Sequence, residues 1–262
     1  MLEALLLGIA QGVSEWLPVS SEGVVTALGS LVFGRSAEEA LALALWLHVG
    51  TALAALWVLR REVTALAREA LRLPRQPSPL LRFAVVATLT SAPVGFVLLA
   101  ALSGIAAAYG AGAMVAVGGL MVVTALTLAR RVVPGMRGRD GLTLTDASLT
   151  GLAQGLAALP GISRSGITVA VLLARGVERT EALALSFLIA IPASAGAAVF
   201  AAVDSGLTRT TDGLVGALAA AVVGALTMRA LLTFARRVNL AWFVGLAGAV
   251  VMAGALWQLL AG

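Results

Sequence analysis

Two short stretches of the sequence hold the residues that could do chemistry. Residues 11–22 read QGVSEWLPVSSE, and residues 159–168 read LPGISRSGIT. Carboxylates can move protons or hold a divalent cation, and hydroxyls can act as nucleophiles. An arginine offers a planar fork of donors that suits phosphoryl oxygens. The combination predicts a site for a phosphate group.

The candidate site residues fall into three groups according to the role expected of them. The acids that could hold a metal or carry protons are Glu15 and Glu22. The residues that could bind phosphate or act on it are Ser20, Ser21, Ser163, Arg164, Ser165 and Thr168. Secondary candidates are Gln11, His48 and Gln154. Because Gln11 and Glu15 are four residues apart, they share one face of a helix.

Helix N-termini are expected to complete this site. Ser20 or Ser21, and likewise Ser163, stand after a proline break as N-cap residues. A helix that begins there points its free N–H groups and positive dipole end at the ligand, and such an end binds phosphate.

Structural roles remain open for the same residues. Arg164 could pair with Glu15 or Glu22 only to lock two segments together, although a buried ion pair is a doubtful source of stability. The serines could be simple helix caps. Gln11 and Gln154 could bond freed backbone groups, and the single histidine could make a bond between helices.

Composition indicates an integral membrane protein. The 262 residues are 60% hydrophobic and 12% charged, and the mean hydropathy is +1.00. Soluble domains have about 25% charged residues. The chain has neither cysteine nor lysine, which excludes disulfides, thiol catalysis and Schiff-base chemistry. Its arginines cluster at the ends of apolar segments, so membrane topology explains the basic charge better than nucleic-acid binding does.

The hydropathy pattern predicts an all-α polytopic fold with six transmembrane helices and two re-entrant hairpins. The expected spans are 39–59, 81–102, 110–129, 182–203, 213–234 and 240–260. Two further apolar regions, 2–33 and 143–176, are each broken in the middle. Each half has about 13–15 residues, which is too short to cross a hydrocarbon core of about 30 Å.

An internal repeat relates the two halves of the single membrane domain. Residues 8–12 (GIAQG) match residues 151–155 (GLAQG) at an offset of 143 positions. The sequence therefore predicts a first repeat over 1–135 and a second over 136–262. Each repeat would contain one hairpin and three spans, and an odd number of spans inverts the second repeat relative to the first.

Arginine positions predict the orientation of the chain. Most arginines fall in four connecting regions, which the positive-inside rule places in the cytoplasm. The hairpin over residues 2–33 then enters the membrane from the outside, and the hairpin over residues 143–176 enters it from the inside. The arginine-rich stretch 60–75 is expected to lie on anionic membrane lipid as an interfacial helix. We expect a multi-pass protein of the plasma membrane.

The motifs at these sites resemble those of the undecaprenyl-diphosphate phosphatase family, also called the bacitracin-resistance protein family. The first motif, [E/Q]-x-x-x-E followed by L-P-x-S-S, reads here as residues 11–15 and 17–21. The second, P-G-x-S-R-S-x-x-T, reads as residues 160–168. The runs 47–51 (LHVGT) and 186–192 (SFLIAIP) also resemble the family, so that the similarity covers nearly the whole chain.

The resemblance implies a membrane phosphatase that removes the terminal phosphate of a polyprenyl diphosphate and so recycles a lipid carrier of cell-envelope glycans. It implies a divalent metal, Mg²⁺ or Ca²⁺, and a site that opens to the non-cytoplasmic side. Glu15 would belong to the catalytic or metal-binding acids, Arg164 would bind phosphate, and the remaining serines and the threonine would line the site. The nucleophile would be Ser21 or a metal-bound water. The sequence leaves a homodimer open.

One position departs from the family pattern. The family has a histidine after the two serines, in [S/T]-G-H, and this chain has Glu22-Gly23-Val24. Either Glu22 or His48 takes over proton or metal work, or hydrolysis has been lost. The substrate could be an undecaprenyl-type or a dolichyl-type lipid. Two other functions remain open: a transporter or flippase of polyprenyl phosphate or another anionic amphiphile, and a non-catalytic scaffold.

Overall fold

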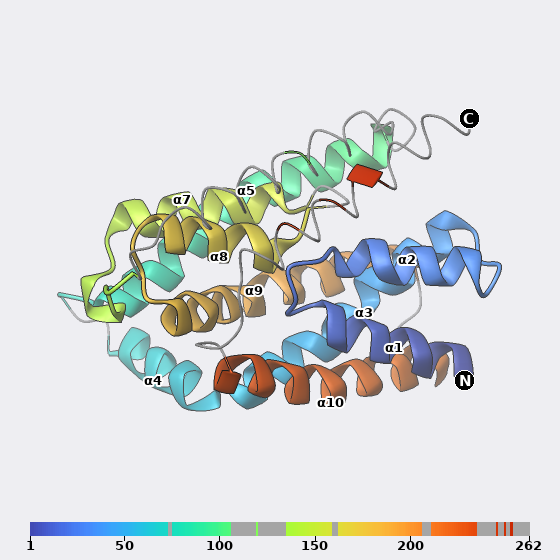
Figure 1. The fold of residues 1–262 in the computed structure, drawn as a ribbon, viewed down its shortest axis with the longest axis horizontal. Coiled ribbons are helices and arrows are strands. Elements are labelled where there is room, and N and C mark those ends of the chain that lie inside the picture. Colours follow the sequence, from blue (N-terminus) through green and yellow to red (C-terminus); the bar gives the residue numbers. More distant parts are fainter. Residues whose placement is uncertain are drawn as a thin grey trace.

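The fold is all helical in the computed structural model. It describes residues 1–72, 75–105, 119, 135–158, 162–205, 211–234, 245, 249 and 252–253. No strand occurs in these ranges, although an isolated bridge joins Arg137 to Val177. The helices pack lengthwise into one elongated bundle (Figure 1).

Four long apolar helices form the frame of the bundle. They are α3 (Ala37–Val58), α5 (Pro79–Ile105), α9 (Arg179–Ser205) and α10 (Thr211–Phe234). The shortest has 22 residues, which corresponds to about 33 Å at 1.5 Å per residue and suffices to cross a bilayer core. All four are apolar enough to be membrane spans. They confirm four predicted apolar segments to within three residues, and the predicted spans 110–129 and 240–260 lie outside the described residues.

The two broken apolar regions each fold as a pair of short helices. The first pair, hairpin one, is α1 (Leu2–Ser14) and α2 (Ser21–Leu31), and the second, hairpin two, is α7 (Leu144–Leu156) and α8 (Arg164–Ala174). The pairs open toward opposite ends of the bundle, and their turns meet near its middle (Figure 1). The breaks therefore lie where the sequence predicts them.

Serine caps begin the second helix of each hairpin. The Ser20 hydroxyl accepts a hydrogen bond from the Gly23 N–H at 3.2 Å, and the Ser163 hydroxyl accepts one from the Gly166 N–H at 3.2 Å. Such a bond satisfies one of the N–H groups that a helix start leaves without a partner. Of the two N-cap candidates in hairpin one, the structure selects Ser20 rather than its neighbour.

The turns of the two hairpins bond directly to each other. Helix α1 ends at Ser14, and in the chain beyond it the carbonyl of Leu17 accepts a hydrogen bond from the Val19 N–H at 2.7 Å. The Ser165 hydroxyl donates to this carbonyl at 2.6 Å, and the Ser163 hydroxyl approaches it at 3.4 Å. Hairpin two therefore supplies further hydrogen bonds to the irregular backbone of hairpin one inside an apolar bundle.

Close glycine contacts attach the first helix of each hairpin to a long helix. A Cβ atom on Gly12 of α1 would lie 2.7 Å from the backbone nitrogen of Gly224 on α10. A Cβ atom on Gly155 of α7 would lie 2.6 Å from the Val94 Cβ on α5. Only glycine lets the backbones approach this closely. The GxxxG spacing repeated in the two halves thus packs each hairpin against a long helix from the other half.

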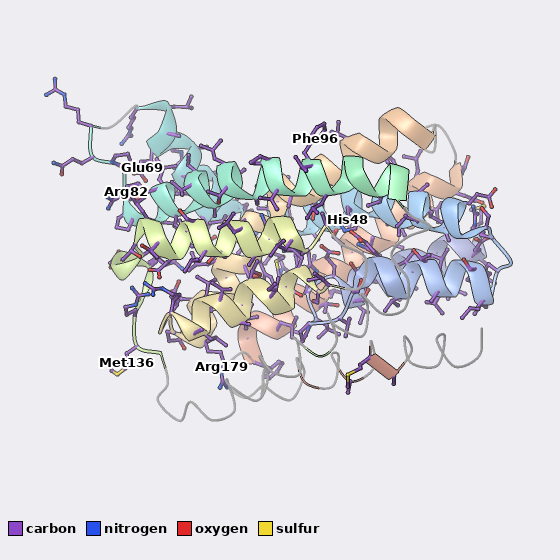
Figure 2. All side chains as sticks on the ribbon, turned by 90° about the horizontal axis from the view of Figure 1, so that it is seen from above. His48, Glu69, Arg82, Phe96, Met136 and Arg179 are labelled. Carbon is purple, nitrogen blue, oxygen red and sulfur yellow. The ribbon has the colours of Figure 1, made fainter. Side chains whose placement is uncertain are left out.

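One end of the bundle is rich in arginine. Glu69, Arg82, Met136 and Arg179 lie at this end (Figure 2). Here α4 (Arg60–Leu71) has no buried residue, and its Val63 and Leu66 pack against the core from the side. The helix occupies most of the stretch 60–75, for which an interfacial helix was predicted.

A buried carboxylate ties the base of hairpin two together at the same end. Asp146 on α7 accepts hydrogen bonds from Arg175 at 2.7 Å and Arg137 at 3.0 Å, and from the Thr143 hydroxyl at 2.8 Å. Burial raises the pKa of Asp146, but these hydrogen bonds outweigh burial, and the net pKa lies below its usual value. The carboxylate therefore stays ionised and joins the two ends of the hairpin.

Candidate active site

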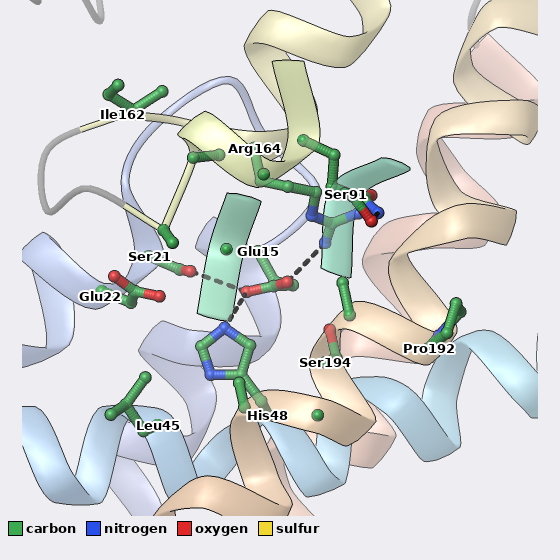
Figure 3. Close-up of a pocket in the computed structure, with 18 of the residues that line it drawn as sticks. Glu15, Ser21, Glu22, Leu45, His48, Ser91, Ile162, Arg164, Pro192 and Ser194 are labelled. Carbon is green, nitrogen blue, oxygen red and sulfur yellow. Dashed lines mark hydrogen bonds and ion pairs between the residues drawn. The ribbon is translucent and has the colours of Figure 1, made fainter. Parts of the chain in front are cut away.

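A cavity of about 340 Å³ lies where the two hairpin turns meet. Its wall comes from both turns and from the middle parts of α3, α5 and α9 (Figure 3). One part of the wall is polar, with Glu15, Ser21, Glu22, His48, Gln154 and Arg164. The other part is apolar and includes Leu45, Ala92, Phe96, Ile162, Ala193 and Ala197. This arrangement suits an amphiphile with a charged head and an apolar tail.

Glu15 is the centre of the polar wall. Its Oε1 accepts a hydrogen bond from Arg164 Nη2 at 2.5 Å, and its Oε2 accepts from the Ser21 hydroxyl at 2.7 Å. Gln11 Nε2 donates to the same Oε2 at 2.9 Å, as expected for residues four apart on one helix face. Both oxygens of this carboxylate therefore have protein donors before any ligand binds.

Arg164 is the first residue of α8 and crosses from hairpin two to hairpin one. Besides Glu15, it donates to the carbonyl of Ser186 at 3.3 Å, and its guanidinium lies over the Trp16 ring at 5.7 Å. The Trp16 ring in turn meets Phe187 edge to face, with centroids 5.1 Å apart. A guanidinium has five N–H donors, so the two bonds to described residues leave donors for a ligand in the cavity.

His48 on α3 also reaches Glu15. Its Nε2 lies 3.4 Å from Glu15 Oε2, and its Nδ1 lies 2.9 Å from the carbonyl of Ala44 (Figure 3). The side chains of His48 and Glu15 are 8% and 3% exposed. A residue that the sequence offered only as a secondary candidate therefore touches the central carboxylate.

Ser163, Ser165 and Thr168 flank Arg164 at the start of α8 and hydrogen-bond to other protein groups. Of these neighbours, Arg164 is the residue that lines the cavity. Thr168 exchanges a hydrogen bond with the Ser186 hydroxyl at 2.7 Å, and the two serines bond to Leu17 as described above. They hold the turn from which Arg164 projects. Their direct contact with phosphate stays a prediction.

The two glutamines find side-chain partners instead of freed backbone groups. Gln11 bonds to Glu15, and Gln154 Nε2 donates to the Ser91 hydroxyl on α5 at 3.2 Å. The Oε1 atoms of Gln11 and Gln154 are buried and have no hydrogen-bond partner among the described residues. Gln154 also lines the cavity.

Glu22 is the acid best placed for a metal ion. It is the second residue of α2 and lines the cavity, whereas the oxygens of Glu15 already accept several bonds. No group of three or more His, Asp or Glu side chains forms a ready metal site in the described part of the chain. Magnesium often binds through one or two carboxylates and takes its other ligands from substrate phosphates and water. The donor set fits a cation held in that way.

Several site residues were not found from the sequence. Trp16 supports the guanidinium, and the carbonyls of Leu17 and Ser186 accept bonds that hold the second turn. An aromatic residue directly after Glu15 was the available signal for Trp16. The backbone carbonyls that act as acceptors could not be predicted from the sequence, because every residue has a backbone carbonyl.

The fold and the site together define a polytopic membrane protein with a cavity whose polar wall contains an acid, an arginine and a serine. The chain belongs to the bacitracin resistance protein BacA family, whose model matches residues 4–253.

Similar proteins are named undecaprenyl-diphosphatase. The protein of that name from Haloarcula marismortui is 42% identical over 253 residues, which cover 91% of each chain. The one from Methanopyrus kandleri is 39% identical and covers 95% of this chain and 94% of its own. The one from Methanococcoides burtonii is 36% identical over 92% of this chain and 93% of its own.

Proposed function

We propose that this protein is a membrane phosphatase that hydrolyses a polyprenyl diphosphate to the monophosphate and inorganic phosphate. The observation that carries the proposal is the contact of Ser21 and Arg164 with one carboxylate, Glu15, at a cavity inside an apolar bundle. The family and the printed names of the relatives support the same activity. The product would be the lipid carrier returned to cell-envelope synthesis.

Arg164 and a helix start would bind the terminal phosphate. The guanidinium supplies charged donors, and the N-terminus of α2 adds backbone N–H groups and its positive dipole end. Arg164 is already oriented by Trp16 and Ser186, so little reorganisation is needed when charge develops on the transferring group.

Ser21 is the proposed nucleophile, with Glu15 as its base. The Ser21 hydroxyl donates to Glu15 Oε2 at 2.7 Å, so its proton passes to that oxygen as Oγ attacks the terminal phosphorus. The bond from this phosphorus to the bridging oxygen breaks, and the polyprenyl monophosphate leaves. Water then cleaves the serine phosphate ester and releases inorganic phosphate. Direct attack by water, with Glu15 as base, gives the same products.

A divalent cation, Mg²⁺ or Ca²⁺, is part of the proposal. When bound, it would neutralise charge on the diphosphate oxygens. Glu22 would hold it at the cavity wall, and phosphate oxygens would supply further ligands. Glu15 would serve mainly as the base, because its oxygens already accept bonds from neighbouring side chains.

The apolar wall of the cavity would take the start of the lipid chain. This apolar wall is formed by Ala92 and Phe96 of α5 together with Ala193 and Ala197 of α9. Burial of the apolar prenyl chain there favours binding by about 25 cal/mol per Å². Undecaprenyl-type and dolichyl-type chains both fit this description.

The proposed membrane arrangement has six spans and two re-entrant hairpins related by an inverted repeat. The serine caps that begin α2 and α8, and the glycine packing of α1 on α10 and α7 on α5, support it. The arginine-rich end would face the cytoplasm, and the cavity would open to the other side of the plasma membrane. α4 would rest on anionic lipid. A homodimer stays a prediction.

Cysteine labelling tests this orientation, because the native chain has no cysteine. A cysteine at Ala70 on α4 should resist a membrane-impermeant reagent added to intact cells, and a cysteine at Leu31 at the end of α2 should react. The reverse pattern would overturn the orientation.

Phosphate release tests the activity itself. The purified protein would be given a polyprenyl diphosphate in detergent with Mg²⁺. Wild type should release phosphate, Ser21→Ala and Glu15→Gln should not, and the control Thr64→Ala on α4 should match wild type. A folded wild type that releases no phosphate but moves polyprenyl phosphate across vesicles would replace the phosphatase by a transporter.

A further inference from the structure

We propose that His48 is a positioning residue, which holds Oε2 of Glu15 against the Ser21 hydroxyl through a hydrogen on its Nε2 atom. The long helix α3 thereby supplies the imidazole that hairpin one lacks at Val24. The kinetic part of this inference rests on the proposed phosphatase activity, whereas the contact itself does not.

The hydrogen bond of the ring to Ala44 leaves Nε2 as the ring nitrogen that faces Glu15. The Ala44 carbonyl can only accept, so Nδ1 at 2.9 Å must carry a hydrogen. A neutral ring would then present the lone pair of Nε2 to the lone pairs of Glu15 Oε2 at 3.4 Å, which is repulsive. A hydrogen on Nε2 makes the contact attractive and leaves Oε2 unprotonated, so that it can still accept the Ser21 proton. Because both side chains are buried, the attraction is little weakened by water.

The position of the ring is set by the packing of α3. Trp46 Nε1 donates to the Gly213 carbonyl at 3.0 Å, and Leu47 is fully buried. A Cβ atom on Gly50 would lie 2.8 Å from the Ala220 Cβ on α10. These contacts prevent α3 from rotating, so the imidazole approaches Glu15 from a direction that neither hairpin controls.

The other candidates for this role are less well placed. Val24 is 36% exposed and does not line the cavity. Glu22 lines the cavity, but no hydrogen bond joins it to Glu15 or Ser21 among the described residues. In the described part of the chain, His48 is the group outside the hairpins that contacts the same carboxylate oxygen as the Ser21 hydroxyl.

Loss of this contact should affect turnover more than binding. Glu15 accepts the proton of the nucleophile, whereas Arg164 makes the main contact with phosphate. A carboxylate that swings away from Ser21 therefore lowers kcat and leaves KM nearly unchanged. We expect His48→Ala to lower kcat about 100-fold, the scale on which a small misplacement of a catalytic group acts. His48→Gln, whose Nε2–H can donate to the same oxygen, should restore most of the loss.

The first experiment is nitrogen NMR on the full-length protein labelled with ¹⁵N-histidine. His48 is the single histidine of the chain, so its ring signals need no assignment. Glu15→Gln should shift the Nε2 signal, and Glu62→Gln on α4 should not. Ring signals that ignore Glu15→Gln would overturn the contact, whether or not the protein is a phosphatase.

The second experiment compares kcat and KM for phosphate release by wild type, His48→Ala, His48→Gln and Thr227→Ala, with far-UV circular dichroism to verify folding. Thr227 bonds to its own helix on α10 and controls for loss of a polar group within a span. Wild-type kcat in His48→Ala, or equal loss in both His48 variants, would overturn the positioning role. A wild type without activity would refute the phosphatase instead, and the NMR result would still decide the contact.

Discussion

The guanidinium of Arg164 and the carboxylate of Glu15 meet at 2.5 Å, although 149 residues separate them in the chain. Their side chains are 14% and 3% exposed. Removing two charges from water costs about as much as their attraction returns, so such a pair is a weak source of stability. Its position on the wall of a cavity indicates that it serves a ligand.

Replacement of Arg164 by lysine should abolish most activity although the charge is kept. A lysine ammonium cannot bond to Glu15 and to the Ser186 carbonyl in the planar geometry of the guanidinium. We expect kcat/KM for phosphate release to fall about 100-fold or more, the usual cost of losing an oriented donor. The control Arg68→Lys on α4 should keep wild-type kcat/KM. Equal kcat/KM for the two variants would contradict the role of the planar guanidinium of Arg164.

Replacement of Gly151 by alanine should destabilise the bundle. A Cβ atom at this position would collide with the Thr90 hydroxyl and with backbone atoms of Ala87 on α5. Overpacking of this kind costs about 1–3 kcal/mol. The midpoint of thermal unfolding in detergent should fall by several degrees.

The matched control for this glycine is Gly138→Ala. Among the described residues, no atom lies within 4 Å of a Cβ atom at Gly138, and its φ of −81° suits alanine. This variant should unfold at the wild-type temperature. A Gly151 variant as stable as the Gly138 variant would show that α7 and α5 can move apart.

The stabilising contribution of the ionised Asp146 carboxylate should decrease in acid. Because its pKa is lowered in the folded protein, the carboxylate contributes stability that is complete above its ordinary pKa of 3.8. That contribution is lost as the pH falls below this value and through the folded pKa. Thermal unfolding of wild type and Asp146→Asn should therefore differ at neutral pH, and the difference should shrink as the pH falls below 3.8. Asp140→Asn, an exposed neighbour, should match wild type throughout; a difference of constant size for Asp146→Asn would contradict the shift.

Removal of divalent metal should stop phosphate release. Chelation of the purified protein should reduce the rate to background, and Mg²⁺ or Ca²⁺ should restore it. Glu22→Gln should raise the Mg²⁺ concentration needed for half-maximal rate about tenfold or more, because one carboxylate ligand is lost. Full activity in excess chelator, with metal absence verified by elemental analysis, would refute the metal requirement.

The helical elements follow from local patterns in the sequence. Apolar runs of 20 or more residues predict α3, α5, α9 and α10, and the proline and serine at each break predict the starts of α2 and α8. The repeat GxxxG predicts tight helix contacts without saying which helix is the partner. The motifs with the serines and Arg164 also predict phosphate chemistry, because they bring unusual polar groups into an apolar chain.

The tertiary structure decides which of these groups meet. It pairs Arg164 with Glu15 rather than Glu22, and it turns Gln11 and Gln154 toward side chains. It also brings His48 from the middle of α3 to the carboxylate. Apart from the bond between Gln11 and Glu15 within α1, none of these contacts is local in sequence, because they depend on how α1 packs on α10 and how the two turns meet. The sequence by itself determined the four long helices, the two breaks and the family to which the chain belongs, whereas only side-chain packing between distant helices decided the partners of each charge.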